Sequence, residues 1–192
     1  MNAFLLRQLA LVVAAALAAS PASAAVTVIG GGLGKACFDA ATFKRDTRSS
    51  IEVCNRALLE EAMSRRDRAA THVNRGIIHM QARDLDRAIA DYDMALTIMP
   101  QLAEAHVNRG IAFLHRGGMD REAVAALTRG LQLNPMRPEV AYYSRAVANE
   151  LLGNVRAAYE DYQAAAAARP GWEEPLEQLK RFTVERRPVE RG

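Results

Sequence analysis

The sequence predicts an all-α solenoid, a stack of antiparallel helical hairpins in which each hairpin completes the core of its neighbour. The first observation is an identical hexapeptide, HVNRGI, which occupies residues 72–77 and again residues 106–111, an offset of 34 residues. The second is a set of small, large and proline residues that recur at nearly constant spacing after each copy, and once more in a diverged third copy. A repeat of this length is typical of stacked helical hairpins.

The recurring positions have separate physical roles. Small residues allow the two helices of a hairpin to cross closely, and large residues on the second helix form a face that the next hairpin must cover. Prolines end each repeat because proline cannot continue a helix. The small residues are Gly76, Gly110 and Ala146 on first helices and Ala88, Ala123 and Ala158 on second helices; the covered face has Tyr92, Leu127 and Tyr162 with Ala95, Gly130 and Ala165; the prolines are Pro100, Pro135 and Pro170.

These positions resemble the tetratricopeptide repeat (TPR) family over residues 69–172. The resemblance implies a right-handed solenoid of about three clear repeats, with a degenerate N-terminal repeat and a C-terminal capping helix. In place of the family's leading Trp and its Leu, this chain has His72, His106 and Tyr142, and Arg75, Arg109 and Arg145. We expect these arginines to pair with acids such as Asp91 and Asp161 on a neighbouring helix rather than to contact a ligand.

The predicted segments follow from the repeats and from the two ends. They are a signal peptide (1–24), a lead-in and degenerate capping repeat (25–68), three repeats (69–172), a capping helix (173–184) and a disordered tail (185–192). No stretch shows sustained strand alternation. Helices are predicted at 36–43, 48–63, 69–82, 85–98, 103–116, 120–133, 139–152, 155–168 and 173–184.

The first residues indicate export. Arg7 precedes an apolar run, residues 9–19, and residues 22–24 have the small-x-small pattern of a signal peptidase site. The run is shorter than the about 20 apolar residues that cross a bilayer. We expect cleavage after Ala24 and a periplasmic or secreted protein. No cysteine follows the cleavage site to accept a lipid, so stable membrane insertion is not expected.

The charge argues against nucleic acid as a partner. The formal net charge is +3, and removal of the signal peptide takes away only Arg7, which leaves +2. Basic residues alternate with acids, as in residues 83–87, RDLDR, which is typical of a solvated helix surface.

The two cysteines, Cys37 and Cys54, are expected to form a disulfide in an oxidising compartment. If helices around 36–43 and 48–63 form a hairpin with its turn near residues 45 and 46, both cysteines lie at similar distances from the turn and face each other. Closing a loop of this length contributes about 3 kcal/mol in the chain-entropy model.

Sites for catalysis, metals and cofactors are not expected. Residues 29–35, IGGGLGK, lack the spacing of phosphate-binding loops and are interpreted as a flexible lead-in. The four histidines, His72, His79, His106 and His115, have no acid or cysteine at metal-ligand spacing. No serine or free cysteine can be combined with a base, so no enzyme activity is predicted.

Binding is expected on the inner face formed by the first helix of each repeat. In the TPR family, which this chain resembles, that face forms a concave groove. An Asn in that groove can hold a peptide backbone because its amide donates and accepts at once. The partner is predicted to be a protein or peptide segment, partly apolar because the neighbours of the asparagines are apolar. Two alternatives stay open: the valines and isoleucines simply pack, or the module is structural or self-associating, with its groove filled by another copy in a homo-oligomer or by its own tail. The groove residues are Val73, Asn74, Ile77, Asn108, Ile111, Tyr143 and Ser144.

Overall fold

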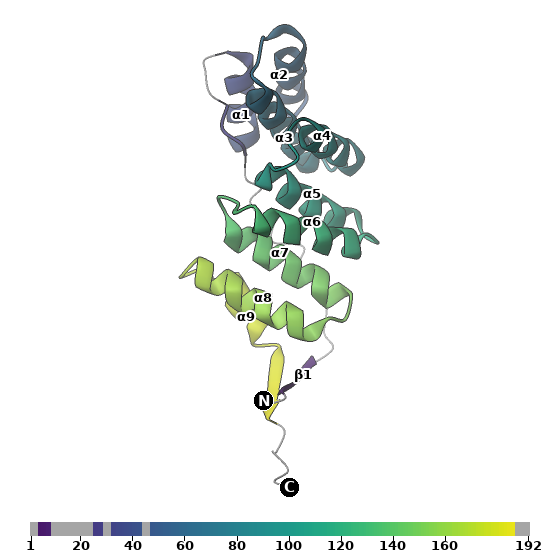
Figure 1. Ribbon diagram of the computed structural model, residues 1–192, viewed down its shortest axis with the longest axis vertical. Helices are drawn as coiled ribbons and strands as arrows, with labels where there is room; N and C mark the ends of the chain where they lie inside the picture. Colours follow the sequence, from purple (N-terminus) through teal and green to yellow (C-terminus); the bar gives the residue numbers. More distant parts are fainter. Residues whose placement is uncertain (1–3, 9–24, 29–31, 44–46, 187–192) are drawn as a thin grey trace.

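The chain folds as a succession of helical hairpins. The computed structural model describes residues 4–8, 25–28, 32–43 and 47–186. Hairpins α1/α2, α3/α4, α5/α6 and α7/α8 follow one another along the long axis, and α9 covers the last (Figure 1). The predicted all-α, TPR-like solenoid is confirmed. The helices are α1 Leu33–Phe43, α2 Thr47–Glu60, α3 Arg65–Gln81, α4 Leu85–Ile98, α5 Ala103–Arg116, α6 Asp120–Gln132, α7 Pro138–Leu151, α8 Val155–Ala168 and α9 Glu173–Leu179.

Most helix ends agree with the sequence pattern. The ranges of α4, α5 and α8 match the predictions residue for residue. α3 starts earlier than predicted, at Arg65, because Ser64 caps it: the Ser64 hydroxyl accepts from the Asp67 backbone N–H at 3.1 Å. The turns of the three hairpins from α3 to α8 each use a residue with a left-handed φ: Arg83 (φ 63°), Gly117 (φ 77°) and Gly153 (φ 75°).

Close helix crossings occur where the pattern places small residues. A Cβ at Gly76 would lie 2.5 Å from Tyr92 Cε1, and a Cβ at Gly110 would lie 2.6 Å from Leu127 Cγ. Real atoms do not approach this closely, so any larger residue would force the hairpin apart. The glycines therefore set how near the two helices of a hairpin can come.

Two tyrosines at equivalent repeat positions are both fully buried but differ in their hydroxyl groups. The Tyr162 hydroxyl donates to Glu150 Oε2 at 2.8 Å. The Tyr92 hydroxyl finds no partner in the part of the chain that the structure describes, because Met80 stands where the third repeat has Glu150.

Removal of each hydroxyl should therefore change stability in opposite directions. Tyr162→Phe should lower the free energy of unfolding by roughly 1 to 3 kcal/mol because it removes a buried hydrogen bond, whereas Tyr92→Phe should raise it by up to about 1 kcal/mol. Urea denaturation of both variants measures this. A Tyr92→Phe variant as unstable as Tyr162→Phe would contradict the assignment.

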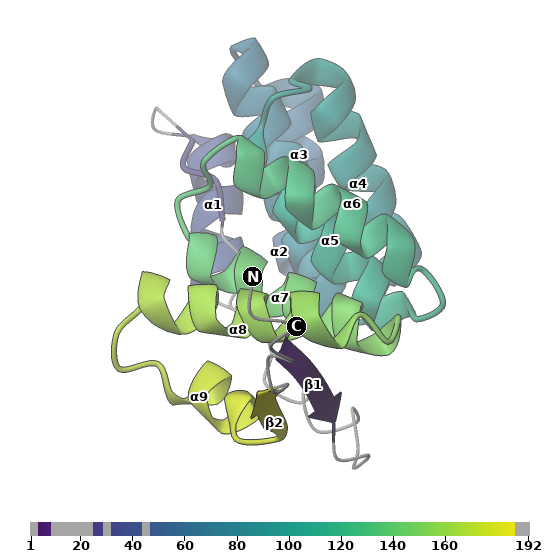
Figure 2. The same cartoon turned by 60° about the horizontal axis from the view of Figure 1, so that its bottom comes forward.

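The C-terminal end differs from the prediction. α9 ends at Leu179 rather than at residue 184, and β2, Phe182–Arg186, pairs antiparallel with β1, Phe4–Gln8. The two strands lie at the end of the stack opposite α1 and α2 (Figures 1 and 2). The expectation that no segment forms a strand was wrong for these two, and residues 185 and 186 belong to β2 rather than to a tail. Residues 187–192 lie outside the described residues.

The physical reason is that Phe182 has a better partner than a further helical turn would give it. Its ring lies 5.6 Å from Tyr159 and 6.0 Å from Tyr162, and it is buried against α8. Trp172, before α9, lies 5.1 Å from Tyr143. The last repeat is thus covered by a shorter helix, a strand and the aromatic rings of Trp172 and Phe182, rather than by the single helix predicted over residues 173–184.

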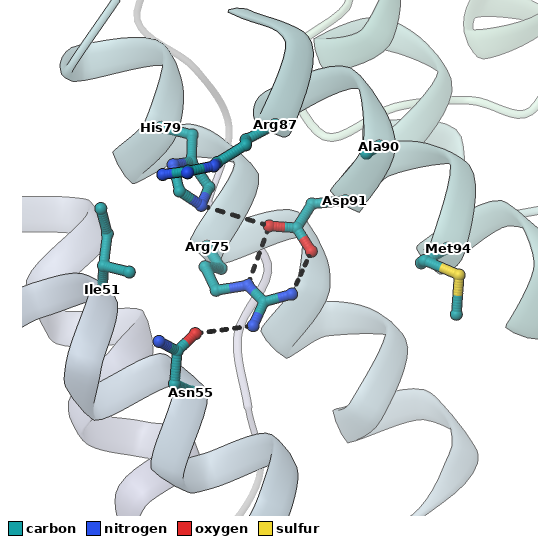
Figure 3. A pocket seen from close by; sticks show the side chains of 8 residues that line it. All are labelled: Ile51, Asn55, Arg75, His79, Arg87, Ala90, Asp91 and Met94. Carbon is teal, nitrogen blue, oxygen red and sulfur yellow. Dashed lines mark hydrogen bonds and ion pairs between the residues drawn. The ribbon is translucent and has the colours of Figure 1, made fainter. Parts of the chain in front are cut away.

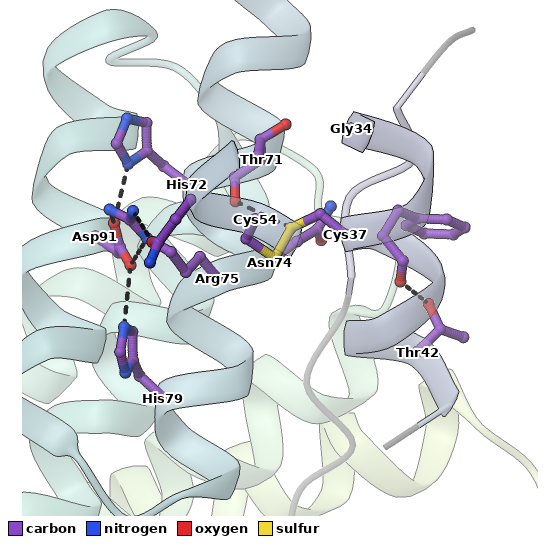
Figure 4. The surroundings of a disulfide bond; sticks show 12 residues. Gly34, Cys37, Thr42, Cys54, Thr71, His72, Asn74, Arg75, His79 and Asp91 are labelled. Carbon is purple, nitrogen blue, oxygen red and sulfur yellow. Dashed lines mark hydrogen bonds and ion pairs between the residues drawn. A yellow bond between two sulfur atoms is a disulfide. The ribbon is translucent and has the colours of Figure 1, made fainter. Parts of the chain in front are cut away.

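The degenerate N-terminal hairpin contains the cysteine pair. The Sγ atoms of Cys37 on α1 and Cys54 on α2 lie at disulfide-bonding distance, 2.05 Å, and both side chains are fully buried (Figure 4). The Cys37–Cys54 pairing predicted from the hairpin agrees with this geometry. None of the described helices has the length and apolar character needed to span a bilayer.

Candidate functional site

The predicted inner face is assembled from α3, α5 and α7, but it is covered in this structure. All seven predicted residues are at most 4 % exposed. We expected a groove that a peptide could enter, but these seven side chains are buried in this structure. Peptide binding by these residues stays a prediction. Their places are Val73, Asn74 and Ile77 on α3, Asn108 and Ile111 on α5, and Tyr143 and Ser144 on α7.

Asn74 already holds a backbone. Its side-chain Nδ2 donates to the Val26 carbonyl at 2.8 Å, and the Val26 N–H donates to Asn74 Oδ1 at 2.9 Å. The predicted chemistry of this Asn, donation and acceptance toward one peptide unit, is thus present. The backbone it binds belongs to the chain itself, in the segment 25–28. From here on, the lead-in means these four residues only.

Two of the other inner-face residues, Ile111 and Tyr143, belong to a cluster around α5 and α7, whereas Val73 and Ile77 belong to the cluster that contains Val26. Ile111 packs with Leu127, Val147 and Tyr143 in the cluster around α5 and α7. The Tyr143 ring is 5.1 Å from Trp172 and 5.5 Å from Tyr162. Tyr143 and Ile111 therefore contribute to the core between repeats, which is the packing alternative considered from sequence.

The recurring arginines form ion pairs between helices, as predicted. Arg75 binds both carboxylate oxygens of Asp91, at 2.7 and 2.9 Å, and Arg145 binds Asp161 at the same two distances. Arg109 has Ala126 at the equivalent position and pairs instead with Asp93 on α4, at 2.7 Å.

Sequence reasoning missed a pocket beside Asp91. It has a volume of about 350 Å³ and lies between α2 and α4 (Figure 3). The Arg75 guanidinium in its wall is already bound by Asp91 and by Asn55 Oδ1, at 2.7 Å, so its charge is satisfied within the fold. The lining residues are Ile51, Asn55, Arg75, His79, Arg87, Ala90, Asp91 and Met94.

Burial and pairing tune the ionisable groups around this pocket. Burial raises the pKa of Asp91, but hydrogen bonds from His72 and Arg75 more than offset it and hold the pKa below its ordinary value. Burial lowers the pKa of His79, against the attraction of Asp91 and Asp84. Among the described residues, no three His, Cys, Asp or Glu side chains are placed to hold a metal ion.

Acidification should destabilise the fold through its histidines. Burial lowers the folded-state pKa values of His79, His106 and His115, while the unfolded chain titrates near the ordinary value of about 6.5. Below that pH the unfolded state binds protons that the folded state does not, so stability is present at neutral pH and is lost as the pH falls.

Thermal unfolding between pH 7.5 and 5.5 tests this. The buried His79 can contribute a slope of at most about 1.4 kcal/mol per pH unit, and His79→Gln should make the pH dependence shallower. An unchanged slope in that variant would show that His79 does not titrate differently on folding.

The residues 29–35 show no phosphate-binding arrangement where they are described. The Gly34 N–H at the start of α1 donates to Glu61 Oε2 at 2.7 Å, and Lys35 pairs with Asp39 at 2.7 Å. A carboxylate of the chain itself thus takes the place that an anion would need. Residues 29–31 lie outside the described residues.

Comparison with known proteins identifies the fold. No family model matches the sequence, and no curated protein matches it at a significant level. Among solved structures, MamA is similar with a TM-score of 0.65 and 20% identity, over 79% of this chain and 82% of MamA. The chain has a tetratricopeptide-repeat-like fold.

Two isolated TPR domains are also similar. The Arabidopsis OM64 TPR domain matches with a TM-score of 0.58 and 20% identity, over 62% of this chain and 96% of that domain. The first TPR of Spaghetti (RPAP3), solved with the HSP90 peptide SRMEEVD, matches with a TM-score of 0.56 and 22% identity, over 60% of this chain and 92% of that one. At these identities the likeness concerns the fold.

Proposed function

We propose that the protein is a non-enzymatic interaction scaffold that binds an extended segment of a protein or peptide along its inner face. The observation that carries the proposal is the contact of Asn74 with Val26, in which one side chain binds both hydrogen-bonding groups of one extended residue. An inner face that holds its own extended segment has the chemistry to hold another.

The similar folds support the kind of partner. The first TPR of RPAP3 was solved with an HSP90 peptide and its second TPR with an HSP70 peptide, SGPTIEEVD. In this chain the residues beside Asn74 on α3 are Val73 and Ile77, and both are apolar. We therefore propose an apolar segment rather than an acidic tail, with no cofactor and no nucleic acid.

A second candidate is a structural or self-associating module. It is favoured by the burial of all seven inner-face residues and by the fact that Asn74 binds the protein's own chain. Sedimentation of the mature protein over a range of concentrations distinguishes the two, because self-association increases with concentration and binding of a different partner does not require it.

We also propose that the scaffold acts outside the cytoplasm, after cleavage behind Ala24. The support is the pattern of the first 24 residues. For protein isolated from the periplasm, we expect the intact mass to correspond to a chain that begins at Ala25. Retention of residues 1–24 on that protein would refute the cleavage, and absence of the protein from the periplasmic fraction would refute the location.

Partner capture with cross-linking tests the scaffold. Mature protein should cross-link to a partner through α3 and α5, and the double variant Asn74→Ala, Asn108→Ala should lose most of these cross-links. Gln101→Ala, an exposed amide in a connecting turn, is the matched control and should capture like wild type. Full capture by the double variant, with its fold verified by circular dichroism, would reject the inner face as the binding surface.

A further inference from the structure

We propose that the lead-in, Ala25–Val28, is a resident ligand of the inner face, and that the partner is an apolar extended segment which displaces it. The inference rests on the proposed function and adds two points: the chemistry of the partner and the presence of a competitor within the chain. It is carried by the contacts of Val26 and Val28, which precede α1.

The backbone contact is that of a neighbouring β-strand. In an antiparallel sheet, a hydrogen-bonded pair of residues exchanges an N–H and a carbonyl bond. Asn74 makes the same two bonds to Val26, at 2.9 and 2.8 Å, with its side-chain amide in place of a second strand. Asn74 is completely buried, so both bonds are shielded from water.

The side chains of the lead-in alternate as in a strand. Val26 is 6 % and Val28 8 % exposed, while Thr27 between them is exposed. Both valines belong to the cluster that contains Val73 and Ile77. A Cβ at Gly34 would lie 3.0 Å from Val28 Cγ1, so the start of α1 leaves only the space that this valine fills.

These contacts define the partner. Asn74 requires a backbone N–H and carbonyl, so the bound residue can be of any type except proline. The apolar surroundings require small apolar side chains at that residue and at the second residue after it, the pattern Val-x-Val. Because Val73 and Ile77 carry no charge, a segment of this kind fits without a terminal carboxylate.

Exchange is feasible because the resident is short. The lead-in offers the main-chain groups of one residue to Asn74 and two valine side chains to the cluster. The sequence that joins it to α1 includes three consecutive glycines, Gly30–Gly32. A competitor binds only those molecules in which the site is free. The resident segment therefore lowers the competitor's apparent affinity in proportion to the fraction of free sites.

The test weakens the resident without altering the site. Val26→Pro in the mature chain removes the N–H that Asn74 Oδ1 accepts, and Thr27→Pro is the matched control, since the exposed Thr27 makes no contact on which the inference depends. The probe is a fluorescent peptide with the sequence of residues 25–32, AVTVIGGG, and its binding is followed by anisotropy.

The peptide should bind Val26→Pro about five- to tenfold more tightly than wild type or Thr27→Pro, because the resident has lost one buried hydrogen bond. Adding Asn74→Ala to Val26→Pro should abolish the gain. Equal affinity for wild type and Val26→Pro would overturn the inference, and so would undiminished binding after Asn74→Ala. Far-ultraviolet circular dichroism verifies the fold of each variant.

The probe requires no cellular partner, so the outcome is separate from the proposed function. Peptide exchange without captured partner would support the resident ligand while refuting the scaffold. Cross-linking of a partner without peptide exchange would leave the scaffold in place and overturn the inference.

Discussion

Asp91→Asn is expected to lower the free energy of unfolding by about 2 to 4 kcal/mol, among the largest effects of any single change in this chain. The buried Asp91 carboxylate accepts two hydrogen bonds from Arg75 and one from His72 Nδ1, at 2.9 Å. Asparagine removes the charge and leaves a guanidinium without its counter-ion. The Arg75 side chain is 23 % exposed, so water partly compensates and the effect falls below that of a fully buried pair.

The matched control lies two residues away. Asp93 pairs with Arg109 at 2.7 Å, but its side chain is 54 % exposed, so Asp93→Asn should cost less than about 1 kcal/mol. Asp161→Asn should behave like Asp91→Asn, because Arg145 binds Asp161 in the same two-pronged way. Urea denaturation of the three variants decides this, and equal effects at Asp91 and Asp93 would contradict the role given to burial.

Loss of the cysteine bridge is expected to lower the free energy of unfolding by about 3 kcal/mol. Cys54→Ser removes a link between α1 and α2 that restricts the unfolded chain, and it places a hydroxyl where the sulfur is fully buried. Because α1 also packs on α3, loosening it should weaken the site beside Asn74 as well.

A reductant provides the control. It should lower the unfolding midpoint of wild type and leave the double variant Cys37→Ala, Cys54→Ala unchanged. Alkylation of both thiols in protein that was never reduced would show that the bridge does not form. Survival of the wild-type midpoint in reductant, with both thiols then alkylated, would show that the bridge contributes little.

Several features follow from the sequence alone because they depend on local spacing. The 34-residue offset of HVNRGI, the small residues at helix crossings and the prolines predict the hairpins and most helix ends. The pairing of Arg75 with Asp91 and of Arg145 with Asp161 follows in the same way, since the two partners of each pair lie in the same hairpin. A repeat makes these contacts between residues that are near in sequence, so periodicity is enough to predict them.

Only the tertiary structure decided what covers the inner face and how the chain ends. The hydrogen bonds between Asn74 and Val26 join residues 48 positions apart, and the β1–β2 pairing joins the two ends of the uncleaved chain, since β1 lies within the proposed signal peptide. Neither contact recurs from one repeat to the next, so the periodicity of the sequence does not predict it. A backbone-binding amide accepts any extended segment, and the Asn74 side chain therefore cannot specify from sequence which segment occupies it. That choice depends on which part of the chain the fold brings within reach.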